Sequence, residues 1–152
     1  MKKIFFILII SLISSSIFAA TVKTPLTKLS KAFKGSELIK IPSYTPPSPN
    51  SFLGIKNGSY KNSPINIDAL IVYPKKGEGP FPIVVFTHSG GGPKMFIKKN
   101  FSFDKKIAKQ LLEKGIAVMF LDNYSGRGAK SLVSLYANYV DAFMTLEYLS
   151  KN

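Results

Sequence analysis

The residues best suited to chemistry lie at positions 82–93, where an apolar run opens into three consecutive glycines. Residues 83–86 (Ile-Val-Val-Phe) are β-branched or aromatic, which is typical of a strand buried on both faces of a parallel sheet. The glycines at 90–92 have no Cβ atoms, so their backbone N–H groups can approach a ligand oxygen closely. This stretch therefore predicts a buried strand followed by a loop that binds an anion or an oxyanion.

Three polar side chains accompany this loop. His88 is the only histidine, which makes it the one candidate for an imidazole general base. Arg127 lies between two glycines after a second apolar run, where it could pair with Asp122 or face a substrate carboxylate. Of these two roles the ion pair is favoured, because such pairs are commoner than substrate contacts. Tyr124 follows the same run and is expected to line the pocket.

The elements that must position these residues follow from the hydrophobic periodicity. Alternating apolar residues predict a strand near a sheet edge, followed by a hairpin-like link into the strand before the glycines. Apolar residues at helical spacing after a cap at Ser102 predict a helix, and a continuous apolar run predicts the next strand, which completes a βαβ unit. A last apolar stripe predicts a long amphipathic helix. The predicted ranges are, in chain order, 65–73, 83–87, 103–112, 116–121 and 132–149.

The chain before residue 65 carries weaker signals. Residues 21–34 are polar and rich in lysine, which predicts a leader or loosely packed arm. Residues 36–44 predict a first strand, and the prolines within residues 45–50 stop regular structure in a loop expected to continue to Pro64. The expected organisation is a signal peptide at 1–19, an arm with a strand and a loop at 20–64, and an α/β domain at 65–152.

Residues 1–19 have the pattern of a secretory signal peptide. Two lysines precede an apolar run, a serine break and a small-residue cleavage site that ends at Ala19. A membrane anchor is the competing interpretation, but the apolar run is shorter than the roughly 20 residues that cross a bilayer, and serine interrupts it. No stable membrane span is expected after cleavage of the signal peptide. We therefore expect the protein in the periplasm or outside the cell.

The composition limits the kinds of site and partner that can be expected. The chain has no cysteine, which excludes a cysteine nucleophile or a zinc–thiolate site within it, and neither a metal nor a cofactor is expected. The formal net charge of +13 suggests an anionic partner, but nearly all the basic residues are lysines scattered in ones and twos. Nucleic-acid readers rely on arginine for bidentate contacts, so nucleic acid is not expected as a partner. Loose association with anionic lipid or cell wall is a minor alternative.

Nucleotide binding is disfavoured by the motifs themselves. Residues 90–92 lack the following lysine and hydroxyl residue of a phosphate-binding loop. Residues 126–128 (Gly-Arg-Gly) begin like a dinucleotide motif, but Ser131 replaces its third glycine.

Three segments together resemble a known family. They are residues 74–92, residues 115–128 with Asn-Tyr-Ser-Gly-Arg-Gly near their end, and residues 139–149. In this order they resemble the front half of a dienelactone-hydrolase-like α/β-hydrolase, over residues 65–152. The resemblance implies a partial α/β-hydrolase fold with a mostly parallel sheet and flanking helices. It also implies an ester or lactone substrate, hydrolysed through a covalent acyl intermediate.

The same resemblance implies roles for residues of the loop. In the family, the loop after the corresponding strand supplies one backbone N–H of the oxyanion hole. That role falls on Gly90, with Gly91 next in line because Ser89 stands where the family usually has glycine. His88 corresponds to a histidine that orients the loop, and this role is favoured over that of a general base.

The catalytic triad has no counterpart in these residues. Ser125 lacks the first glycine of the Gly-x-Ser-x-Gly motif and lies on the wrong strand, and no histidine follows His88. No catalytic residue is therefore assigned: the triad, and a strand pairing with one flank of residues 83–87, are expected beyond residue 152. The chain is expected to be the inactive N-terminal part of an ester or lactone hydrolase. The alternative is a non-catalytic periplasmic binding protein whose glycine loop holds a small anionic or acyl ligand.

Overall fold

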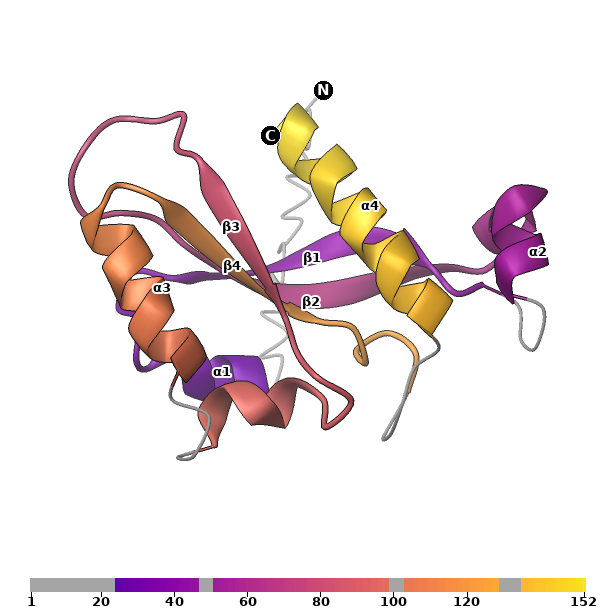
Figure 1. Cartoon of the computed structure of the whole chain (residues 1–152), viewed down its shortest axis with the longest axis horizontal. Coiled ribbons are helices and arrows are strands. Elements are labelled where there is room, and N and C mark those ends of the chain that lie inside the picture. The colour runs from indigo at the N-terminus through magenta and orange to yellow at the C-terminus, as the bar shows by residue number, and fades with distance from the viewer. Residues whose placement is uncertain (1–23, 47–50, 99–102, 129–134) are drawn as a thin grey trace, which may run out of the picture.

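The computed structural model describes residues 24–46, 51–98, 103–128 and 135–152, and these form a mixed α/β structure around an open sheet (Figure 1). The expected signal peptide, the predicted cap Ser102 and the start of the last predicted stripe at Leu132 lie outside these residues. The sheet has four strands in the order β1-β2-β4-β3. Among the described helices, none is both long and apolar enough to cross a membrane.

The sheet is mixed, so the expectation of a mostly parallel sheet is wrong. β1 (Glu37–Tyr44) pairs antiparallel with β2 (Pro64–Val72), and β2 pairs antiparallel with β4 (Ala117–Asp122). Only β3 (Ile83–Thr87) and β4 run parallel. The parallel part is the βαβ unit that the sequence predicts, with α3 (Phe103–Glu113) between its two strands.

β2 lies near a sheet edge, as predicted, since its neighbours are the edge strand β1 and the strand β4. Its last four residues are buried on both faces, since Leu70 and Val72 face one layer of the core while Ala69 and Ile71 face the other. The link from β2 to β3 is therefore not hairpin-like, as it must pass β4 to reach the far side of the sheet.

The predicted strand at residues 83–87 is confirmed as β3, which pairs with β4 alone. Its other flank has no partner strand among the described residues. The expected burial of this strand on both faces is wrong: no residue of β3 is fully buried, and Val84 is 36% exposed, because one side of the strand lacks a neighbour.

The N-terminal arm is not loosely packed, contrary to expectation. Residues 25–30 form a short helix, α1 (Pro25–Ser30), capped by the Thr24 hydroxyl, which accepts the Thr27 N–H at 3.2 Å. Leu26, Leu29 and Phe33 recur on one face and are 5% exposed or less. With six residues, the helix is too short to show its periodicity in the sequence.

The predicted loop at 45–64 contains two short helices, α2 (Ser51–Lys56) and η1 (Ser59–Asn62). Among the described residues they touch little of the core, since η1 has no buried residue and Phe52 and Leu53 of α2 are more than half exposed. The expected loop is thus replaced by peripheral helices that lie beside α4 (Leu135–Lys151) in Figure 1.

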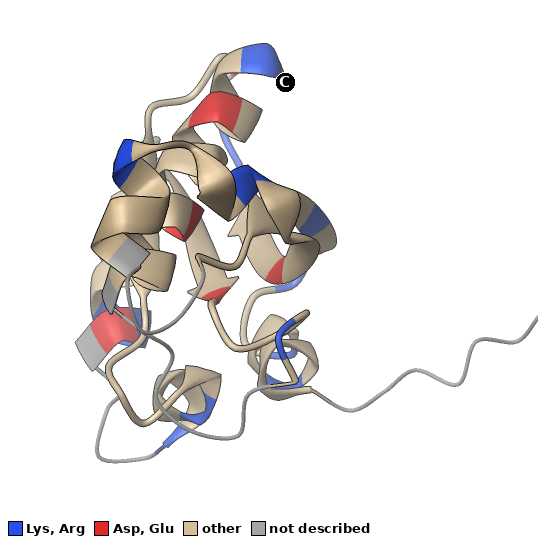
Figure 2. Cartoon of the chain, turned by 90° about the vertical axis from the view of Figure 1, so that its right-hand side faces the viewer, with Lys and Arg blue, Asp and Glu red and all other residues tan. Residues whose placement is uncertain are grey.

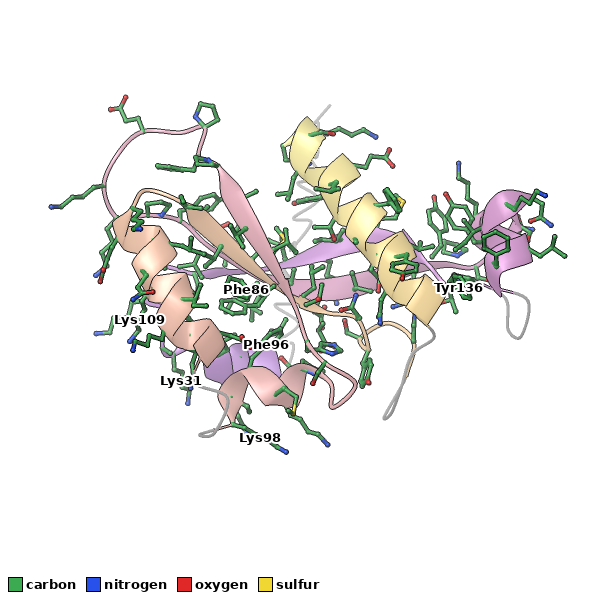
Figure 3. All side chains as sticks on the ribbon, viewed as in Figure 1. Lys31, Phe86, Phe96, Lys98, Lys109 and Tyr136 are labelled. Atoms are coloured by element: carbon green, nitrogen blue, oxygen red, sulfur yellow. The ribbon has the colours of Figure 1, made fainter. Side chains whose placement is uncertain are left out.

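The core consists of two apolar layers, one on each face of the sheet. On one face α1, α3 and the short helix η2 (Pro93–Ile97) surround Phe120, whose ring lies 5.1 Å from the rings of both Phe86 and Phe96 (Figure 3). On the other face α4 covers the alternate residues of β1, β2 and β4.

The final helix is confirmed, but its buried face differs from the predicted stripe. Tyr139, Phe143 and Leu146 belong to that stripe and are 49%, 71% and 60% exposed. Val140, also of the predicted stripe, is buried as expected, but beside it the helix turns the charged residue Asp141 towards β1. A rule that seeks the most apolar face misses this orientation, because a charged residue here occupies the inner face.

The buried α1 generates the first prediction. Leu29→Ala should lower the free energy of unfolding by about 2–5 kcal/mol, because it removes buried methyl groups and leaves a cavity beside Phe120. Lys28→Ala, on the exposed side of the same helix, is the matched control and should change stability by less than about 0.5 kcal/mol. Urea unfolding followed by circular dichroism measures both. Equal stability of the two variants would contradict a core role for α1 and would favour the loosely packed arm that the sequence predicts.

Candidate functional site

A cleft of about 460 Å³ lies where β3 and β4 end. Because these strands are parallel, the glycine loop after β3 and the turn after β4 emerge at the same edge of the sheet, the place where open α/β sheets bind ligands. The antiparallel strand β2 adds Asp68, directly opposite Asp122. Gly91, Lys94 and Tyr124 complete this part of the lining.

His88 joins the two strand ends that form the cleft. Its Nε2 accepts the backbone N–H of Asn123 at 3.2 Å, and its Nδ1 lies 2.9 Å from the carbonyl oxygen of Ser89. A neutral ring satisfies both contacts when its proton is on Nδ1. Nδ1 then donates to the Ser89 carbonyl, and the unprotonated Nε2 accepts the Asn123 N–H. The ring also packs edge-on against Tyr124, with centroids 4.7 Å apart. Both nitrogens are thus engaged by backbone groups, which leaves neither free to take a proton from a nucleophile.

The two glycines predicted to bind an oxyanion have different positions. Gly91 lines the cleft, whereas Gly90 does not and instead accepts the Tyr124 hydroxyl at 2.6 Å through its carbonyl oxygen. Neither Gly90 nor Gly91 donates its backbone N–H to another described residue. Two backbone donors are therefore available beside the cleft.

Gly92 closes the loop and must be glycine. Its N–H donates to the Ser89 carbonyl at 2.9 Å, and its φ of +78° lies in the region that other residues avoid. A Cβ atom there would lie 2.8 Å from the Tyr124 ring, closer than packed carbon atoms tolerate. The loop and Tyr124 consequently hold each other in place.

Asp122 terminates β4 and organises the turn that follows. One oxygen of its carboxylate accepts the N–H groups of Tyr124 at 3.0 Å and Ser125 at 3.1 Å. Burial raises the pKa of Asp122, and the charge of Asp68 adds to the rise, while the two backbone bonds and His88 oppose it. An acid with a raised pKa thus lies in the cleft.

Ser125 has a structural role in this turn. Its hydroxyl donates to the Asp122 carbonyl at 2.8 Å and accepts the backbone N–H of Asp68 at 2.6 Å. The serine Oγ is therefore committed to backbone groups and has no histidine partner, in keeping with its absence from the predicted catalytic residues.

Arg127 forms an ion pair, but not with the predicted partner Asp122. Its two terminal nitrogens bind the two carboxylate oxygens of Asp141 on α4, each at 2.8 Å. The same nitrogens donate to the carbonyls of Asn123 at 2.6 Å and Tyr44 at 2.8 Å. The side chains of Arg127 and Asp141 are 5% and 0% exposed, so this arginine is held inside the protein and does not face the cleft.

Asp141, with Asn123 and Ser43, was missed by the sequence analysis. The Asp141 carboxylate also accepts the Asn123 amide at 2.7 Å and the Ser43 hydroxyl from β1. Asp141 stands between Val140 and Ala142 in a largely apolar helix, and Arg127 is the only arginine. Those two facts were the available signal for a buried pair.

Within the described residues there is no group of three or more histidine, cysteine or acidic side chains that could hold a metal ion. Asp68 and Asp122 face each other, but Asp68 is bound by Lys40 at 2.6 Å, and Asp122 by backbone N–H groups. The donors present are suited to binding an uncharged oxygen compound through backbone N–H groups.

The buried ion pair generates a stability prediction. Asp141→Asn should lower the free energy of unfolding by about 3–5 kcal/mol, because it leaves the buried Arg127 charge without its counter-ion. Glu147→Gln is the control: it breaks an exposed pair with Lys151 on the same helix, which solvent screens, and should leave stability nearly unchanged. Chemical unfolding of both variants measures the difference, and similar losses would contradict a structural role for the buried pair.

The raised pKa of Asp122 generates a prediction on pH. The folded state keeps a proton on Asp122 at pH values where the unfolded chain, with its ordinary pKa of about 3.9, has lost it. The contribution of Asp122 to the free energy of unfolding is thus fully present below about pH 3.9, and it is lost as the pH rises through the raised pKa of the folded state. Asp122→Asn does not titrate and keeps an oxygen for both N–H bonds, so its stability relative to the native chain should increase between pH 4 and pH 7.

Unfolding in urea at several pH values tests this. The exposed Glu78→Gln variant corrects for the change in net charge. A relative stability of Asp122→Asn that falls with rising pH would show that the Asp122 pKa is lowered instead.

Comparison with known proteins adds no family to these observations. No protein-family model matches the chain, and no curated protein matches it. The hydrolase resemblance therefore rests on the residues and motifs that carry it, and the function is argued from the geometry of the cleft.

Proposed function

We propose that this chain provides the acyl-binding loop of an exported hydrolase of the dienelactone-hydrolase type, which acts on ester or lactone bonds. The observation that carries the proposal is the pair of unengaged backbone donors, Gly90 and Gly91, beside a 460 Å³ cleft at the carboxyl edge of β3 and β4. Small-molecule sites have volumes of about 300–1,000 Å³ and a few convergent polar groups, and this cleft falls within that range.

The charges of the cleft favour a neutral substrate. Asp68 and Asp122 face it, and Lys94 is the only cation in its lining among the described residues. A carboxylate ligand would meet these acids, whereas an ester or lactone carbonyl is uncharged until it is attacked. One backbone donor directed at the developing oxyanion is worth roughly 3 kcal/mol of transition-state stabilisation.

The described residues support binding and polarisation of a carbonyl, not attack on it. The Ser125 hydroxyl and both His88 nitrogens are engaged by backbone groups. In the proposed reaction His88 orients the loop, and the nucleophile and its base come from outside the described residues. Export to the periplasm or the medium belongs to the proposal and is supported by the sequence of residues 1–19.

The alternative is a non-catalytic protein that binds an anionic or acyl ligand with the same loop. It is favoured by the absence, among the described residues, of a nucleophile hydrogen-bonded to a base. The two hypotheses differ in the preferred charge of the ligand and in the reactivity of the bound carbonyl.

Binding of a lactone and of its hydrolysis product tests the proposal. We expect δ-valerolactone to shift the Gly90 and Gly91 amide signals in a ¹⁵N-resolved NMR titration and to bind at least about fivefold more tightly than 5-hydroxyvalerate. Tyr124→Phe removes the hydroxyl that holds Gly90 and should weaken binding severalfold, while Tyr60→Phe, which lies outside the cleft lining, should not. Tighter binding of 5-hydroxyvalerate would favour the non-catalytic alternative.

Reactivity provides the second measurement. The 152-residue chain alone should hydrolyse p-nitrophenyl acetate no faster than background, whereas added hydroxylamine should attack the bound lactone faster than the free one. Saturable hydrolysis of the ester without hydroxylamine would refute the assignment of the described residues to binding alone. A lactone that binds but is not activated would favour the non-catalytic protein.

A further inference from the structure

A second and larger cavity, of about 810 Å³, lies at the opposite end of the sheet from the glycine loop. Its position follows from the strand register: Val72, at the cavity, pairs with Val118 at the start of β4, whereas Asp68, at the glycine-loop cleft, pairs with Asp122 at its end. The segment after α1, the segment after β2 and the end of α3 surround it. The proposed hydrolase function makes no use of this cavity.

The floor of the cavity is apolar and recessed. Phe33 and Val72 are 5% and 4% exposed and belong to the core layer beneath, while Leu112 is half-buried. Tyr73 stands at the margin, where burial and the charge of Glu37 raise its pKa, so it is present as a neutral phenol at physiological pH. An apolar chain on this floor would contact the core without displacing any buried polar group.

The rim of the cavity is strongly basic. It carries Lys31, Lys34, Lys75, Lys76 and Lys109, against Glu113 as the only acid in the lining among the described residues. All five ammonium groups are exposed, and none forms a salt bridge with a described residue. Lys31, directly after α1, and Lys109, on α3, come from different parts of the chain and lie on the same side of the molecule in Figure 3. Like charges gathered in this way repel one another, and a bound anion relieves that repulsion.

We infer that this cavity binds a small amphiphilic anion, such as a medium-chain carboxylate. Its apolar chain would lie on Phe33, Val72 and Leu112, and its charged head would lie among the lysines. The volume falls within the range of about 300–1,000 Å³ that small-molecule sites have. On the side of the molecule drawn in Figure 2, the basic residues of the described chain lie on several separate elements.

The geometry favours a single molecule over a membrane surface. A protein that binds a bilayer interface inserts protruding apolar side chains, with basic residues behind them. Here the order is reversed, since the apolar residues form the recessed floor and the lysines project around it.

Titration calorimetry of the 152-residue chain with three ligands tests the inference. Decanoate has both the chain and the charge, decanol has only the chain, and acetate has only the charge. We expect decanoate to bind saturably and at least tenfold more tightly than either of the others, and to bind more weakly as salt is raised. Equal binding of decanol, or no decanoate binding below millimolar concentrations, would overturn the inference.

Two triple variants with the same change of net charge locate the site. Lys31→Gln/Lys75→Gln/Lys109→Gln removes rim charges, and Lys28→Gln/Lys56→Gln/Lys98→Gln removes exposed charges outside the lining. The rim variant should lose at least tenfold in decanoate affinity and the control less than twofold. Both keep the apolar residues 4–13, so any binding there is common to both. Equal losses would show that net charge alone attracts the ligand.

Two further measurements keep the test decisive. In the native chain, decanoate should shift the methyl signals of Leu112 and leave the backbone amide signals of Gly90 and Gly91 unchanged, which separates this site from the glycine loop even if a variant fails to fold. Vesicles containing phosphatidylglycerol should bind more weakly than decanoate at equal accessible anion concentration. Tighter vesicle binding that the rim variant loses would make the cavity a membrane-docking surface and overturn the inference of a single bound molecule.

Discussion

The arrangement of the other elements depends on the contacts of one buried group, the carboxylate of Asp141. It binds the Arg127 guanidinium, the Asn123 amide and the Ser43 hydroxyl, and so joins α4, the turn after β4 and the end of β1. A buried ion pair stabilises a protein only when hydrogen bonds compensate for the loss of water around both charges. Here both carboxylate oxygens accept more than one bond, and Arg127 also donates to two backbone carbonyls.

This network determines the geometry of the candidate site, although none of its charges faces the cleft. Arg127 and Asn123 hold the turn at residues 123–128, and that turn carries Tyr124. Tyr124 in turn binds the Gly90 carbonyl and packs against His88, so the position of the glycine loop is determined by contacts on the next strand. Loops become useful for binding when a rigid scaffold positions them in this manner.

The strands that bear the site were predictable because their signals are local. The apolar runs that become β3 and β4 and the helical spacing of α3 appear in the structure within a residue or two of the predicted bounds. The order of the strands was not predictable in the same way. β2 is an interior strand because β4 pairs with it from a distance of about fifty residues along the chain, and no local pattern encodes that pairing.

The errors at the two ends of the described chain have a common physical cause. The lysine-rich N-terminal arm contributes Leu26 and Leu29 of α1, and Phe33 after it, to the core, and α4 turns the charged Asp141 inwards while Phe143 remains exposed. Average polarity favours the opposite arrangement in both places. A few apolar residues at the right spacing, or one charge with a complete set of partners, outweighed the composition around them. The Arg127 pair illustrates this point: an ion pair was predictable from its sequence context, but its partner was not, since Asp122 is near in sequence and Asp141 is near in space.

The contact between Ser43 and Asp141 spans 98 residues, and this has a consequence for the order of folding. Joining residues so far apart costs chain entropy before any contact compensates for it, so local units such as β3-α3-β4 form readily while the closure by α4 waits for β1 and β2. Contacts made late in folding are absent from the transition state, and they act by slowing unfolding. We therefore expect the Asp141 network to slow unfolding of the assembled sheet more than it speeds folding.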